Sequence, residues 1–117
     1  MNFLYNINVD EKLFWFFFGS NILKFEWDPD KNRINQQEHK VSFEEASTIF
    51  LSSFLEIPDI EHSINEERFT AFGISALRRE LFVCYCYRNK NDNEEIIRII
   101  SARKATKDEK EDYFNEG

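Results

Sequence analysis

Two arginines interrupt an isoleucine-rich segment near the end of the chain, and their chemistry is the first feature that needs an explanation. Residues 96–102 read Ile-Ile-Arg-Ile-Ile-Ser-Ala, and β-branched residues favour a buried, pleated strand. A guanidinium is rarely buried without a partner, so Arg98 and the following Arg103 must each reach a carboxylate, an anion or water. Because a guanidinium binds phosphate through two parallel hydrogen bonds, this segment is the candidate anion site.

The spacing of these arginines raises a geometric problem. Strand alternation places Arg98 and Arg103 on opposite faces, unless a bulge intervenes or the strand ends near Ala102 and the chain turns. A helix is predicted to begin directly afterwards, because residues 106–109 (Thr-Lys-Asp-Glu) have the form of a capping box. Five basic and two acidic side chains give residues 98–110 a charge of +3, whereas the whole chain carries −7.

Composition limits the chain to one modest core. Its 117 residues are 42% hydrophobic and 16% aromatic, which is typical of a single soluble domain. The net charge of −7 argues against general nucleic-acid binding but permits a local basic site, because charges are screened over about 8 Å at physiological salt. Cys84 and Cys86 are expected to be reduced core thiols, as in a cytoplasmic protein, and we expect neither a cofactor nor a metal site.

The first part of the chain is unusual. We expect residues 1–22 to be an aromatic-rich extension and residues 23–117 to form a single domain. The extension contains a dense apolar run at residues 13–18, which is too short for a membrane span of about 20 residues. The preferred interpretation is an added strand that covers a sheet edge or a core face, and the alternatives are an interfacial anchor or a partner contact.

Local signals predict the helices. Asp28 and Pro29 are an N-cap and first-turn pair for a helix that should end near Gln37. Ser42 is the expected N-cap of a second helix that ends near Leu51, with Glu45 as its capping-box partner. The third predicted helix follows the strand at residues 96–102 and begins at the capping box of residues 106–109.

The strands complete the predicted fold. A short alternating strand is predicted at residues 23–27, and a meander at residues 68–73, 81–87 and 96–102. Residues 56–67 contain five acidic residues and no lysine or arginine, and we expect a loop there. The sequence therefore predicts an α+β fold with a small antiparallel sheet of about four strands, two N-terminal helices and one C-terminal helix.

Short motifs are spread over most of the chain. They are Phe25-Glu26-Trp27-Asp28-Pro29, Lys31 with Asn35, His39 with Val41-Ser42-Phe43-Glu44-Glu45-Ala46, His62-Ser63, Glu66-Glu67-Arg68-Phe69, and Arg98-Ile99-Ile100-Ser101-Ala102-Arg103-Lys104-Ala105-Thr106 followed by Glu109 and Tyr113. Together they resemble the BrnT family of toxins over about residues 24–117. The resemblance implies a RelE-like fold and an endoribonuclease toxin of a type II toxin–antitoxin system that inhibits translation and growth. It also implies neutralisation by a BrnA-like ribbon-helix-helix antitoxin, with operator DNA bound only through that antitoxin and no membrane partner.

Two departures from the family pattern support an alternative function. The family usually has Lys-His-Gly where this chain has Glu38-His39-Lys40, so a cation and a turn glycine are lost. Residues 1–22 have no counterpart in the family. The alternative is a catalytically inactive member that acts as an antitoxin-binding module or operon co-repressor. The net charge and Glu38 favour this alternative, whereas the retained arginines favour a toxin.

Cleavage of RNA without a metal requires three chemical roles. A base accepts the 2′-hydroxyl proton, cations stabilise the phosphorane, and an acid protonates the leaving oxygen. The cationic candidates are Arg68, Arg98 and Arg103. The structural alternative for each arginine is an ion pair with a carboxylate such as Glu67, Glu94 or Glu109.

The remaining candidates each have a structural alternative as well. His39 is a possible base or acid, or else a residue that satisfies backbone groups before a helix cap. Lys31 reaches the substrate from the first helix or remains solvated, and Glu67 is either a base or the partner of the next arginine. Tyr113 places its ring near the site or packs against its neighbour, and His62 in the acidic loop ranks last.

Overall fold

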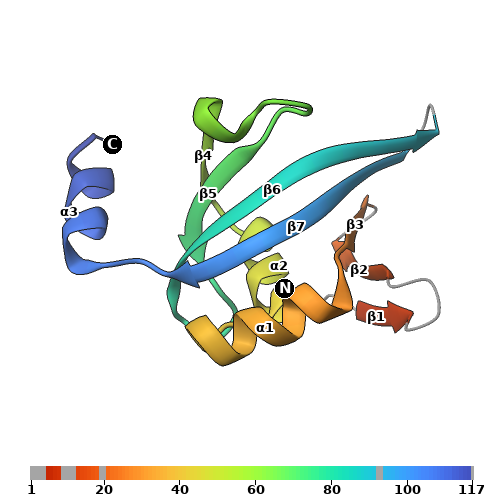
Figure 1. Cartoon of the computed structure of the whole chain (residues 1–117). Helices are drawn as coiled ribbons and strands as arrows, with labels where there is room; N and C mark the ends of the chain where they lie inside the picture. Colours follow the sequence, from red (N-terminus) through yellow and green to blue (C-terminus); the bar gives the residue numbers. More distant parts are fainter. Residues whose placement is uncertain (1–4, 9–12, 19–20, 92–93, 117) are drawn as a thin grey trace.

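The computed structural model describes residues 5–8, 13–18, 21–91 and 94–116, and it gives side chains for residues 23–88 and 96–112. In this part of the chain a mixed seven-stranded sheet in the order β1-β2-β3-β7-β6-β5-β4 is covered on one face by short helices (Figure 1). The elements are β1 (Tyr5–Asn8), β2 (Leu13–Phe18), β3 (Asn21–Glu26), α1 (Pro29–His39), α2 (Phe43–Ser47), the 3-10 helix η1 (Thr48–Leu51), β4 (Leu55–Pro58), the 3-10 helix η2 (Ile60–His62), β5 (Phe69–Ile74), β6 (Glu80–Asn91), β7 (Glu94–Lys104) and α3 (Lys107–Glu116).

The predicted α+β class is confirmed. The sheet has more strands than the four expected, and it is mixed rather than antiparallel. The sheet is not wholly antiparallel, because β3 runs parallel to β7. A parallel pair needs a crossover connection, and the helices and the β4–β5–β6 meander supply it. β4 lies within the segment that was expected to be a loop. It is a short edge strand with little buried surface, ended by Pro58, so it has no hydrophobic alternation that would reveal it.

The extension contributes two strands to the sheet. β2 pairs antiparallel with β3, and β1 pairs with β2 at the edge of the sheet. The preferred interpretation of residues 13–18 as an added strand therefore agrees with the backbone, although their side chains lie outside the described set. The division at residue 22 stays a prediction. No helix in the described residues is long and apolar enough to cross a membrane.

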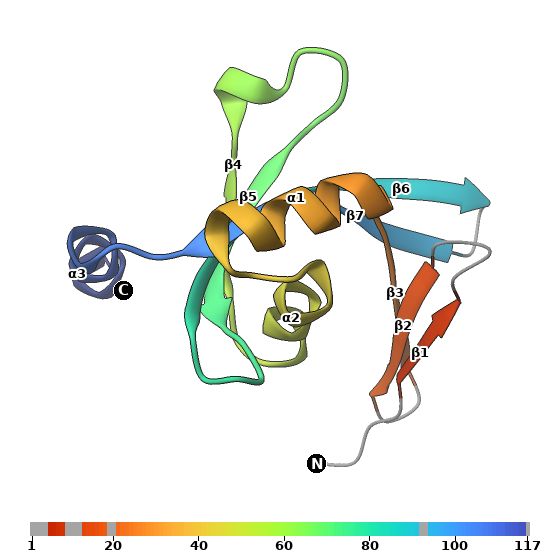
Figure 2. The same cartoon turned by 60° about the horizontal axis from the view of Figure 1, so that its bottom comes forward.

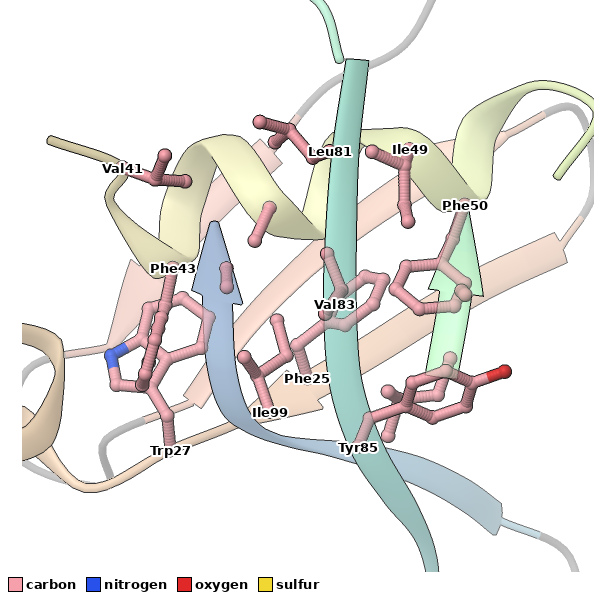
Figure 3. Packing of buried hydrophobic residues seen from close by; sticks show 14 residues of the cluster. Phe25, Trp27, Val41, Phe43, Ile49, Phe50, Leu81, Val83, Tyr85 and Ile99 are labelled. Carbon is pink, nitrogen blue, oxygen red and sulfur yellow. The ribbon is translucent and has the colours of Figure 1, made fainter. Parts of the chain in front are cut away.

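The core lies between the sheet and α2 with η1. Figure 3 shows Phe50 beside Tyr85 and Phe43 beside Trp27 within this cluster. Ser42 caps α2 as predicted, since its hydroxyl accepts a hydrogen bond from the Glu45 amide at 3.0 Å.

The side chain of Glu45 does not close the predicted capping box. Its carboxylate instead accepts hydrogen bonds from Ser75 Oγ at 2.7 Å and from Arg79 Nε at 2.9 Å. Burial of this carboxyl raises its pKa, but the hydrogen bonds from Arg79 and Ser75 outweigh burial and hold the pKa of Glu45 below its usual value. This charged network ties the β5–β6 hairpin to α2.

A bulge in β7 solves the geometric problem of the two arginines. Cys84 lies opposite Ser101 whereas Tyr85 lies opposite Ile99, so Ile100 is an extra residue in β7. The bulge shifts the alternation by one position, and Ile99 and Ala102 are both buried in the core. Arg98 and Arg103 consequently share the face turned away from the core, which we call the open face.

Asn35 holds the bulged part of β7 in place. The β3 strand pairs with β7 only as far as Arg98, so the backbone at Ala102 needs another partner. Asn35 Oδ1 accepts a hydrogen bond from the Ala102 amide at 3.1 Å, and Asn35 Nδ2 donates to the Ala102 carbonyl at 2.8 Å and to the Val41 carbonyl at 2.9 Å. The buried amide therefore replaces a strand neighbour and also fixes the turn between α1 and α2.

We predict that Asn35→Ala lowers the free energy of unfolding by about 2–4 kcal/mol, because it leaves buried backbone groups without partners. Gln37→Ala changes an exposed residue of the same helix and should alter stability by less than about 0.5 kcal/mol. Urea denaturation of the two variants measures the difference. Equal stabilities would show that Asn35 does not support β7.

Candidate functional site

A pocket of about 380 Å³ opens on the open face of the sheet, above the bulge in β7. Its walls come from the end of α1, the loop between β4 and β5, and strands β5, β6 and β7. The lining residues are His39, Asp59, His62, Arg68, Thr70, Phe82, Cys84, Ile100, Ser101, Ala102 and Arg103. Two imidazoles and two guanidiniums therefore gather in one cavity.

Arg103 is held at the rim of the pocket by the C-terminal helix. Its two terminal nitrogens donate to the two carboxylate oxygens of Glu109, both at 2.7 Å, and its guanidinium lies 5.0 Å from the centre of the Phe82 ring. Glu109 also accepts a hydrogen bond from the Thr106 amide at 2.9 Å, and Thr106 Oγ1 accepts from the Glu109 amide at 3.2 Å. The predicted capping box is thus confirmed. Figures 1 and 2 show that α3 stands away from the sheet, and the pair of Arg103 and Glu109 joins its first turn to β7.

Arg98 does not reach the pocket. Its Nη1 donates to Glu26 Oε2 at 2.6 Å, and the two residues are neighbours in the β3–β7 register. Arg98 was predicted as a phosphate-binding candidate with an ion pair as its structural alternative, and the structure shows the ion pair. Its catalytic role stays a prediction. The carboxylate beside it comes from a parallel strand far away in the sequence, which strand alternation alone does not reveal.

Arg68 lines the pocket without a carboxylate of its own among the described side chains. Its Nε is buried and has no hydrogen-bond partner in that part of the structure. The neighbouring Glu67 is exposed and lines no part of the pocket, so the structure gives no support for a pair between Glu67 and Arg68. Among the described side chains, Arg68 is therefore a pocket guanidinium for which no ion pair with a carboxylate is found.

Two histidines from different elements line the pocket. His39 is the last residue of α1, with Nε2 4.0 Å from Glu38 Oε2, and the chain turns after it because Lys40 adopts a left-handed conformation with φ of 60°. Lys40 is thus a non-glycine residue at a turn position that glycine would adopt with less strain. His62 Nδ1 lies 3.0 Å and 2.9 Å from the two carboxylate oxygens of Asp59.

The structure brings together three of the seven site candidates and adds two residues. His39, Arg68 and Arg103 line the pocket, whereas Lys31 is exposed on α1 outside it. The Tyr113 side chain lies outside the described residues. His62 was ranked last among the candidates and Asp59 was not considered, because an acidic stretch suggests a solvated loop. Their i, i+3 spacing in a turn was the available signal.

Cysteine and metal chemistry add little to this site. Cys84 lines the pocket as a half-buried free thiol, and burial raises its pKa, so it stays protonated at neutral pH. The neighbouring Cys86 is buried and also free. Among the described residues, no three histidine, cysteine or acidic side chains gather in a metal-binding arrangement.

Comparison with known families gives one match. Residues 27–109 match the family model of the ribonuclease toxin BrnT of type II toxin–antitoxin systems. The matched stretch contains all of the residues that line the pocket, as well as Glu109, and it excludes β1 and β2. No curated protein matches the chain.

The ion pair between Arg103 and Glu109 should make stability depend on acid pH. The hydrogen bonds from Arg103 lower the pKa of Glu109 from 4.5 to about 2, so this carboxylate stabilises the fold above pH 4.5 and loses that effect as the pH falls towards 2. The melting temperature of wild type should therefore exceed that of Glu109→Gln at pH 7, and the difference should shrink below pH 4.5. Glu111→Gln, an exposed change on the same helix, should leave the melt nearly unchanged at both pH values. A difference between wild type and Glu109→Gln that is constant down to pH 3 would contradict this assignment.

Proposed function

Because the chain belongs to the BrnT family of ribonuclease toxins of type II toxin–antitoxin systems, we propose that its pocket on the open face cleaves RNA without a metal. The observation that carries the proposal is the joint placement of Arg68, Arg103, His39 and His62 in one cavity of about 380 Å³. Guanidiniums suit the charge that develops on phosphorus, and imidazoles suit proton transfer near neutral pH.

The phosphate of the substrate binds between the two arginines of the pocket. Arg68 lines the pocket and has no ion pair with a described carboxylate, so its guanidinium would donate to an entering phosphate without first losing such a partner. Arg103 is already ordered in the fork geometry that a phosphate requires, and the substrate would replace the carboxylate of Glu109. Removing such a cation costs on the order of 2–4 kcal/mol of transition-state stabilisation.

The net negative charge of the protein affects how RNA binding should depend on salt. A net charge of −7 repels a polyanion at long range, so attraction must come from the local cations of the pocket. Salt weakens that long-range repulsion as well as the local attraction. We therefore expect a weaker salt dependence of RNA binding than basic nucleases show.

We further propose that the chain follows the type II arrangement in its finer details. It acts in the cytoplasm, where cleavage of RNA inhibits translation and growth. A BrnA-like ribbon-helix-helix antitoxin binds it and contacts the operator DNA, whereas the toxin reaches that DNA only through the antitoxin. The RelE-like fold inferred from the family resemblance belongs to the same proposal.

The second candidate function is a catalytically inactive partner of the antitoxin. The ion pairs of Arg98 with Glu26 and of Arg103 with Glu109, together with Glu38 near His39, favour it because they neutralise cations that would otherwise bind phosphate. Arg68 favours catalysis because it has no such partner among the described side chains.

Expression of the chain without its partner tests catalysis directly. We predict growth arrest and fragmented transcripts for wild type, and a 10²- to 10³-fold slower RNA cleavage by purified Arg68→Ala. Arg33→Ala removes an exposed cation of α1 outside the pocket and should cleave RNA as fast as wild type. Normal growth with folded wild-type protein at high level would favour the inactive partner, and unchanged cleavage by Arg68→Ala would remove this arginine from the site.

The antitoxin proposal has a separate test. We predict that the chain co-purifies with the product of the adjacent reading frame and elutes with it as one complex at micromolar concentration, since an unchecked nuclease harms its own cell. Size-exclusion chromatography of the co-expressed pair measures this, with each protein run alone as the control. Separate elution at that concentration would refute a tight type II pair.

A further inference from the structure

We propose that His62, oriented by Asp59, is the general base of this pocket and that His39 is the general acid, an inference that rests on the proposed ribonuclease activity. No pairing of these residues follows from their order in the sequence, because 22 positions separate the two histidines. The tertiary structure places both imidazoles and the two arginines around one cavity.

The contact between Asp59 and His62 selects a tautomer. Both carboxylate oxygens of Asp59 lie within 3.0 Å of Nδ1 of His62, so Nδ1 must carry a proton and donate it. In the neutral ring the other nitrogen, Nε2, then holds the lone pair and accepts protons. The same carboxylate stabilises the imidazolium that forms after proton transfer. Asp59 is thus a positioning residue, and His62 is the group that contacts the substrate.

Backbone hydrogen bonds fix the loop that carries this pair. Ser63 Oγ donates to the Asp59 carbonyl at 2.6 Å and accepts from the Arg68 amide at 2.9 Å, and the Asp59 amide donates to the Arg68 carbonyl at 2.8 Å. These bonds close the loop on itself between β4 and β5. Asp59, His62 and Arg68 all line the pocket, so the loop that orients His62 is tied directly to the residue proposed to bind the phosphate.

Other ionisable groups line the same pocket from the surrounding elements. They are Arg68 just before β5, His39 at the end of α1, Cys84 on β6, Arg103 on β7 and Asp59 on the same loop. A guanidinium has no acceptor for a proton, and burial raises the pKa of Cys84, so none of these three groups competes as a base at neutral pH. Within the pocket, only the imidazoles and the Asp59 carboxylate remain to accept a proton, and Asp59 is engaged by His62.

The reaction that these groups support is an internal transfer in RNA. The 2′ oxygen forms a bond to the adjacent phosphorus while its proton passes to Nε2 of His62. The bond from phosphorus to the 5′ oxygen breaks, and this oxygen takes a proton from the imidazolium of His39. The products are a 2′,3′-cyclic phosphate and a 5′-hydroxyl end. His62 then loses one proton to water and His39 regains one, so the cycle closes without another reactant.

The pH profile of RNA cleavage by the full-length chain tests the assignment. Wild type should show a bell-shaped profile, because one imidazole must be neutral and the other protonated. We expect His62→Ala to lower kcat by 10²- to 10⁴-fold, to lose the acid limb of the profile and to recover activity in added imidazole. His39→Ala should lose the basic limb. Asp59→Asn should slow the reaction about 10- to 100-fold with both limbs retained, because it disturbs only the orientation of His62.

A matched control separates catalysis from loop stability. Glu61→Gln changes an exposed carboxylate in the same 3-10 helix, outside the pocket, and should leave rate and profile unchanged. If wild type cleaves RNA and His62→Ala keeps the bell shape at a reduced rate without imidazole rescue, His62 is not the base, although the proposed function stands. If folded wild type cleaves no RNA, the proposed function itself fails. Ends that carry a 3′-hydroxyl would also overturn this chemistry.

Discussion

The site depends on how β7 is held after its neighbour β3 ends. Asn35 supplies both an acceptor and a donor to the backbone of Ala102, and the same side chain binds the Val41 carbonyl. One buried amide thus joins α1, the turn before α2 and the bulged strand. Because the bulge at Ile100 places Arg103 on the same face as Arg98, the cavity wall exists only while this part of β7 keeps its register.

Charge is distributed in this protein so that few cations are available to a substrate. Glu26 binds Arg98, Glu109 binds Arg103 and Glu45 binds Arg79, each across a long or intermediate sequence separation. Arg68 differs, because its Nε is buried in the pocket wall with no partner among the described residues. The net charge of −7 is therefore compatible with a local cationic group in the pocket, because repulsion by distant carboxylates is screened over about 8 Å at physiological salt.

The acidic segment has two structural roles beyond its charge. Glu56 on β4 accepts hydrogen bonds from the hydroxyls of Tyr85 and Tyr87, which fastens this edge strand to the sheet. Asp59 turns towards His62, and Ser63 closes the loop through the Arg68 amide. A stretch whose composition suggests a solvated surface thus supplies one wall of the cavity, and its carboxylates act through particular contacts.

The sequence by itself determined the helix starts, because interactions between residues close together in the sequence decide them. The caps at Asp28 and Ser42 and the capping box of Thr106 with Glu109 act over three or four residues, so the pattern of residue types was enough to predict them. Only the tertiary structure decided the parallel pairing of β3 with β7, the position of the bulge, the partner of Glu45 and the separation of Arg98 from the pocket. These features depend on which distant strand or side chain arrives at a given place, and packing of the whole chain determines that.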